Sequence, residues 1–200
     1  MKRTFEEAMA HRRSYYSIGN DSPVNDEEVV HIVREAVKHV PSAFNSQSTR
    51  IVVLFGNEHL KLWNIVKETL KRIVPAEAFA KTEAKIDGCF ACGHGTVLYW
   101  EDAAVVRKLQ DSFPAYRENF PGWSQQTSAM HQFAVWTMLE DLGLGASLQH
   151  YNPLIDDEVR RTWNLPADWT LVAEMPFGIP TAEPEEKEFG DLSKRIKIFL

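Results

Sequence analysis

Three residues near the N-terminus form the first group that could bind a ligand. Arg12 and Arg13 are followed directly by Ser14, at the expected end of a helix. Guanidinium groups match the oxygens of a phosphate and a hydroxyl adds a neutral donor, so the triplet suits an anion. Two arginines also complement the dipole at the C-terminal end of a helix. Taken alone, the triplet favours this second, structural interpretation.

A second polar group lies in the segment PSAFNSQSTR, from Pro41 to Arg50. It separates an expected helix from an expected strand. The amides of Asn45 and Gln47 both donate and accept hydrogen bonds, which suits the edge of a flat heterocycle with alternating C=O and N–H groups. The side chains could equally satisfy the backbone of their own turn. The sequence leaves both interpretations open.

One pair of cysteines is the sharpest candidate for a metal or redox centre. Cys89 and Cys92 are followed by His94, but a structural zinc ion needs four ligands and the chain has no second cysteine pair. A redox dithiol normally lies at a helix N-terminus, whereas this pair precedes an expected strand. We therefore favour two packed, apolar-like cysteines and expect no bound metal.

Other motifs of catalysis are missing from the sequence. It contains no G-x-S-x-G nucleophile elbow, no P-loop and no complete dinucleotide fingerprint. The seven histidines lack ligand spacing on any one helix, and His131 is expected in the core or at an interface. No side chain therefore stands out as a catalytic acid, base or nucleophile.

Length and charge restrict the class of protein. The chain has 200 residues, so we expect a single domain over residues 1–200. Its formal charge of −6, without a basic block, disfavours nucleic acid and anionic lipid as partners.

The longest apolar run is too short for a membrane span, and the N-terminus lacks an apolar leader segment. Two cysteines fit a reducing compartment, so a cytoplasmic location is expected.

Caps and apolar spacing predict the elements that must position these groups. Thr4 with Glu7 and Asn25 with Glu28 form capping boxes, and Asn57, Asp102 and Asp156 are expected to cap further helices. Helices are predicted over residues 4–13, 25–40, 57–74, 76–87, 102–109, 124–142 and 156–164. Strands are predicted over residues 50–56, 96–101, 170–178 and 194–200, the first of them buried on both faces.

This order predicts an α+β fold, because strands and helices do not alternate as a doubly wound sheet requires. Helix 124–142 is apolar on nearly all faces and should be central, ended by Gly143 and Gly145. The Pro- and aromatic-rich segment Phe113–Trp123 is predicted as a loop or lid. The apolar strand 194–200 needs a sheet to join, which a neighbouring chain can supply. Together with the two polar groups, this tail predicts a phosphate-bearing planar cofactor held between subunits.

The chain resembles the nitroreductase family of FMN-dependent oxidoreductases. The resemblance rests on R-R-S near the N-terminus and on the later P-S-x-x-N-S-Q. It is nearest to the subfamily of fungal fatty-acid-repression-type proteins and related bacterial enzymes, in which N-S-Q-S replaces N-S-Q-P-W. The blocks Gly95–Asp102 and Gly143–Asp156 are also similar, whereas Tyr16 stands where many members have a basic residue.

The resemblance implies a nitroreductase-like fold, with a central mixed or antiparallel sheet surrounded by helices, in a homodimer with a swapped C-terminal strand. It implies FMN as cofactor, NADH or NADPH as co-substrate, and a small-molecule acceptor such as a nitroaromatic or quinone. Hydride would pass through flavin N5 in a ping-pong cycle, and the chemistry would belong to the cofactor. The alternative is a flavin-binding protein of stress or lipid regulation with little turnover.

The resemblance also assigns the FMN site by position. The phosphate, the ribityl chain or the pyrimidine edge would contact the N-terminal triplet, and a basic residue near the C-terminus would complete the phosphate site. The loop would approach from the partner subunit. These residues are Arg12, Arg13 and Ser14; Pro41, Ser42, Ala43, Asn45 and Gln47; Gln149 and His150 along the isoalloxazine; and Lys187, with Arg195 as the reserve.

Overall fold

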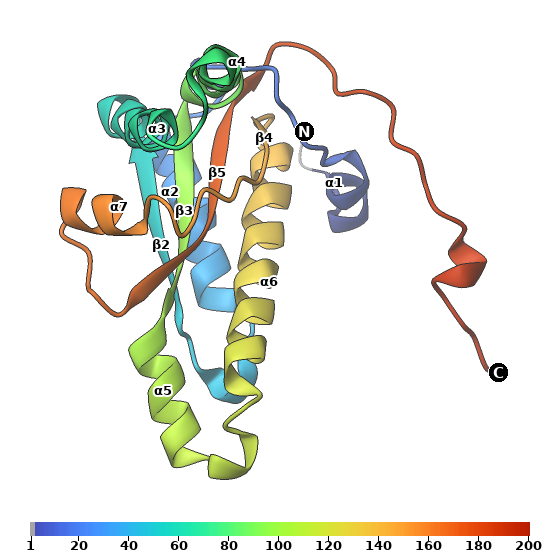
Figure 1. The fold of residues 1–200 in the computed structure, drawn as a ribbon. Helices are drawn as coiled ribbons and strands as arrows, with labels where there is room; N and C mark the ends of the chain where they lie inside the picture. The colour runs from blue at the N-terminus through green and yellow to red at the C-terminus, as the bar shows by residue number, and fades with distance from the viewer. Residues whose placement is uncertain (1–2) are drawn as a thin grey trace.

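A five-stranded antiparallel sheet carries the fold in the computed structural model, which describes residues 3–200 (Figure 1). The strands run in the order β1-β5-β3-β2, and β4 pairs with β5 beside this path. Every pairing between named strands is antiparallel, which confirms the predicted α+β class. The strands are β1 (Ile18–Gly19), β2 (Thr49–Phe55), β3 (Gly95–Asp102), β4 (Gly145–Ala146) and β5 (Trp169–Pro180).

Helices occupy most of the remaining chain. Short turns of 3-10 helix span Ala43–Asn45, Pro114–Tyr116 and Leu192–Lys194, and Asp87–Ala91 forms a π-helix. None of the helices in the described part of the chain is long and apolar enough to cross a membrane. The α-helices are α1 (Phe5–His11), α2 (Asp26–His39), α3 (Gly56–Lys71), α4 (Ala76–Ile86), α5 (Ala103–Ser112), α6 (Phe120–Asp141) and α7 (Asp156–Thr162).

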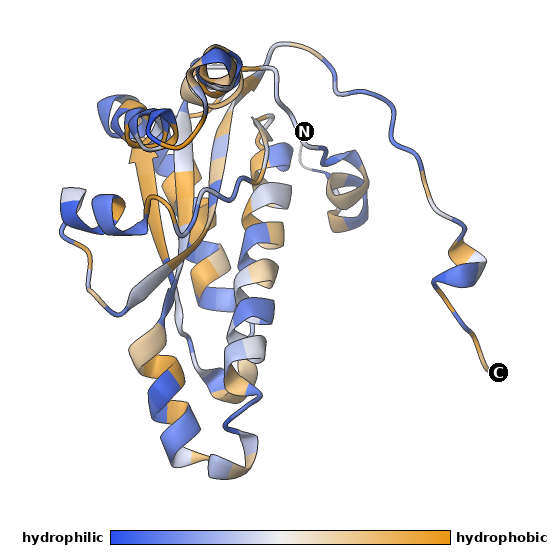
Figure 2. Cartoon of the chain, viewed as in Figure 1, coloured by the Kyte–Doolittle hydropathy of each residue, from blue (hydrophilic) through white to orange (hydrophobic). Residues whose placement is uncertain are grey.

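Both faces of the sheet are covered. Helices α2 and α6 pack on the face that carries Val97 and Tyr99 of β3. Helices α3 and α7 pack on the opposite face, which carries Leu98 and Trp100. Successive side chains of a strand point to opposite faces, which explains why β3 is apolar at consecutive positions and buried almost throughout. Figure 2 shows the apolar colour concentrated along these strands.

Strand β2 departs from the prediction of burial on both faces. It lies at the edge of the sheet, and most of its residues are only half-buried in the single chain. An edge strand also leaves a row of backbone N–H and C=O groups unpaired. The apolar run of β2 was read correctly as a strand, but its position in the sheet was not.

Three of the five predicted helix N-caps are confirmed and two are wrong. Both capping boxes form, and the Asp102 carboxylate accepts hydrogen bonds from two backbone N–H groups of α5. The other two predicted caps are wrong. Helix α3 begins at Gly56, before Asn57, and Asp156 lies inside the first turn of α7, after Ile155.

The segment Phe113–Trp123 is mostly helical, so the predicted long loop is wrong. Pro114 opens a 3-10 turn, and α6 already begins at Phe120 with Pro121 in its first turn. Proline is tolerated there because the first N–H groups of a helix have no intrahelical partner. Helices α5 and α6 therefore form a hairpin at one end of the molecule (Figure 1).

The C-terminal residues form an exposed tail that leaves the body after β5 (Figure 1). In the single chain, residues 195–200 do not form the predicted strand. Ile196, Ile198 and Leu200 are exposed. These side chains have no sheet to join within the described residues.

Candidate functional site

The structure brings three predicted site residues into one cleft. Arg13, Ser14 and Lys187 line a cavity of about 590 Å³, here called the N-terminal cleft, between residues 13–17 and residues 182–187. Arg13 Nη2 donates a hydrogen bond to the carbonyl oxygen of Glu185. Glu183 and other acidic residues line the same cleft. Its surface is therefore mixed in charge.

Close packing at β4 fixes the N-terminal side of this cleft. Ser14 forms an isolated parallel bridge with Ala146, and the Tyr15 N–H donates to the Ala146 carbonyl at 2.9 Å. A Cβ added at Gly145 would come within 2.7 Å of the Tyr15 ring, so this position needs glycine. Gly143 ends α6 as predicted, with φ +82°, whereas Gly145 serves the contact with Tyr15.

Arg12 does not line the N-terminal cleft. Its guanidinium carbon lies 4.5 Å from the ring centroid of Trp136 in α6. Its Nε is buried and has no hydrogen-bond partner among residues 3–200. Burial lowers the pKa of Arg12, which remains a strong cation.

Gln149 and His150 lie further along the sheet, since Gln149 pairs with Glu174 of β5, which pairs with Leu98 near the middle of β3. The backbone of Gln149 exchanges hydrogen bonds of 2.7 and 3.0 Å with Glu174 of β5. The Gln149 Nε2 donates to Ser147 Oγ at 3.1 Å, whereas His150 is exposed. Arg195 is also exposed but belongs to the C-terminal tail and does not line the cleft.

The second polar group, here called the amide loop, comprises Pro41 to Gln47. The Gln47 N–H donates to Ser42 Oγ at 3.0 Å, which is the self-satisfied turn that one interpretation predicted. The side chains of Asn45 and Gln47 are on exposed residues and make no hydrogen bond within the described chain. The turn is therefore closed as one interpretation predicted, and the two amides remain available for a ligand, which stays a prediction.

The backbone of the amide loop is strained. Phe44, Asn45 and Gln47 have φ of 56°, 50° and 48°. A left-handed conformation costs a non-glycine residue roughly 1–2 kcal/mol. Such strain persists only where the surrounding structure imposes it, and it is frequent at functional sites.

A buried carboxylate holds the end of the loop at β2. The hydroxyls of Ser48 and Thr49 donate to the two oxygens of Glu101 at 2.7 and 2.6 Å. Burial raises the pKa of Glu101, and the two hydroxyl donors and Arg50 act in the opposite direction. The carboxylate is 3% exposed, so both hydroxyls are fixed inside the fold.

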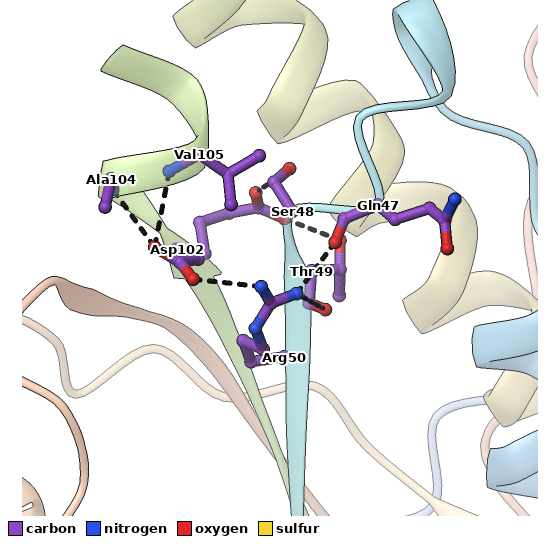
Figure 3. A network of polar contacts seen from close by, with 8 residues as sticks. Gln47, Ser48, Thr49, Arg50, Asp102, Ala104 and Val105 are labelled. Carbon is purple, nitrogen blue, oxygen red and sulfur yellow. Dashed lines mark hydrogen bonds and ion pairs between the residues drawn. The ribbon is translucent and has the colours of Figure 1, made fainter. Parts of the chain in front are cut away.

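An ion pair fixes the same end of the loop from the outside (Figure 3). Arg50 Nη1 donates to the Gln47 carbonyl at 2.7 Å, and Nη2 donates to Asp102 Oδ2 at 2.9 Å. The other Asp102 oxygen accepts the N–H groups of Ala104 and Val105. The loop is thus tied to the start of α5 through a continuous polar network.

The N-terminal cleft and the amide loop lie at opposite ends of the sheet. Ala146, beside Ser14, pairs with Phe177, which also pairs with Gly95 at the start of β3. The carbonyl of Ser48 accepts a hydrogen bond from Asp102 at the other end of β3. Seven strand residues at about 3.3 Å each put the two groups on the order of 23 Å apart. One small cofactor cannot contact both within a single chain.

The cysteine pair has a structural environment. Cys92 Sγ donates to the carbonyls of Ile18 at 3.2 Å and Gly88 at 3.1 Å, and Cys89 packs against an apolar cluster. Across residues 3–200, no three His, Cys, Asp or Glu side chains are grouped so that they could hold a metal. His131 is buried and its Nδ1–H donates to the Thr127 carbonyl at 2.9 Å, as expected of a core histidine.

Two buried acids and two aromatic residues were missed by the sequence reasoning. Glu174 is fully buried, its Oε2 accepts the Tyr151 N–H at 3.0 Å, and its Oε1 has no partner in the described chain. Burial raises the pKa of Glu174 to about 8. A charged residue within an apolar strand was the available signal for both Glu101 and Glu174. Phe44 and Trp136 gave no comparable signal.

Several known proteins are similar to this chain in sequence and in structure. The sequence matches the model of the nitroreductase family over residues 9–179. Nitroreductase FRM2 of Saccharomyces cerevisiae is 34% identical over 91% of each chain. The structures of nitroreductase CinD from Lactococcus lactis with chloramphenicol and with 4-nitrophenol are 44% identical, with a TM-score of 0.88 over 98% of this chain and 100% of theirs. A Desulfovibrio desulfuricans structure in complex with FMN is 17% identical, with a TM-score of 0.71 over 100% of this chain and 99% of its own, and shares the fold.

Proposed function

This chain belongs to the nitroreductase family and is an oxidoreductase; on that premise we propose that it is an FMN-dependent enzyme. It uses NADH or NADPH to reduce nitroaromatic or quinone-type acceptors. Chloramphenicol and 4-nitrophenol, the ligands of the CinD structures, are both nitroaromatic, which supports this class of acceptor. The two free cysteines fit a reducing, cytoplasmic location.

The donors of the chain fit the phosphate of FMN. Arg13 and Lys187 supply positive charge in the N-terminal cleft, and Ser14 supplies a hydroxyl. Charge-assisted hydrogen bonds from such cations are the strong ones in phosphate recognition. Arg12 does not line the cleft, and its guanidinium, which packs on Trp136, would add positive charge at longer range. Together these groups would hold the phosphate and the ribityl chain.

The amide loop fits the ring end of the same cofactor. Asn45 and Gln47 present free amides on a loop whose backbone is fixed by hydrogen bonds. Each amide can match both donors and acceptors of a pyrimidine edge, and preorganised donors stabilise negative charge where it develops. When bound, FMN would supply the redox chemistry, a two-electron transfer from the nicotinamide to the acceptor in a ping-pong cycle.

We propose a homodimer because of the distance between the N-terminal cleft and the amide loop. Because the amide loop and the N-terminal cleft lie at opposite ends of β3, the loop of one subunit must complete the site of the other. The free edge of β2 and the exposed apolar tail support this arrangement. The tail of each subunit would pair with the partner's sheet, which would bury side chains such as Ile198 and Leu200.

The experiment that tests the proposed function is spectroscopic. Purified protein reconstituted with FMN should show a flavin spectrum that NADH or NADPH bleaches without oxygen and that 4-nitrophenol or a quinone restores. Protein that binds FMN but is never bleached by either nicotinamide would contradict the enzyme and favour the flavin-binding regulator. Protein that refuses FMN would contradict both. A side-by-side titration with NADH and NADPH gives the preferred co-substrate.

A further inference from the structure

The side chain of Phe44 links the amide loop to the α5–α6 hairpin. Its ring centroid lies 4.8 Å from that of Phe113, 5.3 Å from that of Phe120 and 6.0 Å from that of Trp123. The planes of Phe44 and Trp123 are nearly parallel, at 19°. Tyr116 adds a further contact at 5.7 Å. One residue of the loop therefore contacts four aromatic rings of the hairpin.

These contacts act against the backbone strain of the loop. Phe44 itself has a left-handed φ of 56°, and its neighbour Asn45 has a φ of 50°. A bulky residue rarely adopts this conformation, because its Cβ crowds the following carbonyl oxygen. Offset and edge-to-face aromatic pairs are favourable beyond their buried area. The ring of Phe44 is the group in the loop that makes such contacts, and so it stabilises a conformation that the backbone alone disfavours.

Some residues near Phe44 are fixed by hydrogen bonds, whereas the two amides are not. Ser42 closes the turn by accepting the Gln47 N–H, and Ser48 is fixed by Glu101. The side-chain amides of Asn45 and Gln47 lie between these fixed points, are exposed and make no hydrogen bond within residues 3–200. Their direction is therefore set by the backbone at positions 44 to 47. That backbone is held on one side by the ring of Phe44.

We propose that Phe44 is a positioning residue, whose half-exposed ring packs against the aromatic rings of the α5–α6 hairpin and so orients the amides of Asn45 and Gln47 toward FMN. The part of this inference that concerns FMN rests on the proposed function. The part that concerns the loop does not. The loop and the hairpin form one unit, so a change in the aromatic rings also alters the recognition of the cofactor ring.

Three substitutions of Phe44 distinguish the effect of its ring from the effect of the backbone strain. Phe44→Gly removes the ring and also relieves the left-handed strain, since glycine adopts positive φ freely. Phe44→Ala removes the ring and keeps the strain, and Phe44→Leu retains an apolar side chain. We expect the FMN dissociation constant, measured by flavin fluorescence titration, to rise about tenfold in Phe44→Gly and Phe44→Ala, with Phe44→Leu at an intermediate value. Wild-type affinity in Phe44→Gly would overturn the proposal.

A matched control distinguishes positioning from general loss of stability. Asn164 has the same left-handed conformation, with φ 48°, at the exposed end of α7. Asn164→Ala should lower stability without changing the FMN dissociation constant. An equal rise in the dissociation constant for Asn164→Ala and Phe44→Ala would overturn the role of Phe44.

A readout without FMN keeps the inference separate from the proposed function. The Gln47 amide hydrogen, bonded to Ser42 Oγ in the wild type, should exchange about tenfold faster in Phe44→Gly apoprotein. Unchanged exchange at Gln47 would overturn the proposal even if FMN affinity falls. If the wild type binds no FMN, the proposed function fails, while faster exchange in Phe44→Gly would still establish Phe44 as the residue that orders the loop.

Discussion

The guanidinium carbon of Arg12 lies 4.5 Å from the ring centroid of Trp136, whereas its neighbour Arg13 faces the N-terminal cleft. Two adjacent residues of the same charge therefore have different surroundings. Arg12 packs on Trp136 of α6, and Arg13 donates a hydrogen bond to the carbonyl oxygen of Glu185 in the cleft. This difference predicts that the two arginines can be distinguished by substitution.

Arg13→Ala should weaken FMN binding about tenfold or more, because a charge-assisted hydrogen bond to phosphate is lost. Its melting temperature should stay near that of the wild type. Arg12→Ala should weaken FMN binding and also cost about 1 kcal/mol of stability, because the contact with Trp136 is lost. FMN titration and thermal unfolding of the apoproteins measure both effects. Identical melting temperatures for the two variants would contradict the separation, and unchanged FMN occupancy in the double variant would refute the phosphate assignment.

Removal of the Glu101 carboxylate should release the start of β2. Glu101→Ala leaves the hydroxyls of Ser48 and Thr49 buried without an acceptor, which costs about 1–3 kcal/mol for each unpaired group. Glu101→Gln keeps one acceptor oxygen and should be distinctly less destabilising. Urea unfolding of both variants measures the difference. Equal losses in the two variants would show that the hydroxyls do not need this acceptor.

The pH dependence of the free energy of unfolding should reveal the raised pKa of Glu174. Its pKa is about 8 in the folded protein, against 4.5 for an ordinary glutamate, so the folded state holds a proton that the unfolded state releases in this range. The stability contributed by the protonated acid is complete below pH 4.5 and is lost as the pH rises to about 8. Each pH unit in between costs about 1.4 kcal/mol.

Glu174→Gln cannot ionise and should remove this slope. Urea unfolding of wild type and variant between pH 5 and pH 9 should give curves that diverge, with the variant relatively more stable at higher pH. The neighbouring acid Asp156 also has a pKa raised by burial, so some slope should persist in the variant. Parallel curves for the two proteins would mean that Glu174 does not carry the excess proton.

Loss of the apolar tail should dissolve the proposed dimer. Deletion of residues 192–200, or the single change Ile198→Asp, removes the side chains that would pair with the partner's sheet. Light scattering after gel filtration should then report monomers, with FMN affinity reduced because each site lacks the partner's amide loop. Lys197→Ala, the neighbouring polar position, is the control and should remain dimeric. A dimer that survives the deletion would contradict the role of the tail.

Features set by neighbours in sequence were the ones that could be predicted. The capping boxes at Thr4 and Asn25 need only a residue three positions later, and both form. The apolar pattern of α6 correctly placed it against the sheet, but its burial on all faces was wrong for the single chain, in which Met130 and Phe133 are exposed.

Features set by distant parts of the chain could not be predicted in the same way. The edge position of β2 depends on which strand pairs with which, and the apolar pattern of an edge strand does not differ from that of a central one. The left-handed φ of Phe44 occurs where its ring contacts Phe113 and α6 residues that lie far from it in sequence. Trp136 becomes the contact of Arg12 only once α1 packs beside α6.

The separation of the N-terminal cleft from the amide loop predicts how two different mutant chains would combine in one dimer. In a homodimer of this kind, a cleft defect such as Arg13→Ala damages both sites, and so does a loop defect such as Gln47→Ala. A mixed dimer of the two mutant chains would combine both defects in one site and leave the other site intact. Two alleles that are each inactive alone should therefore complement one another when expressed in the same cell.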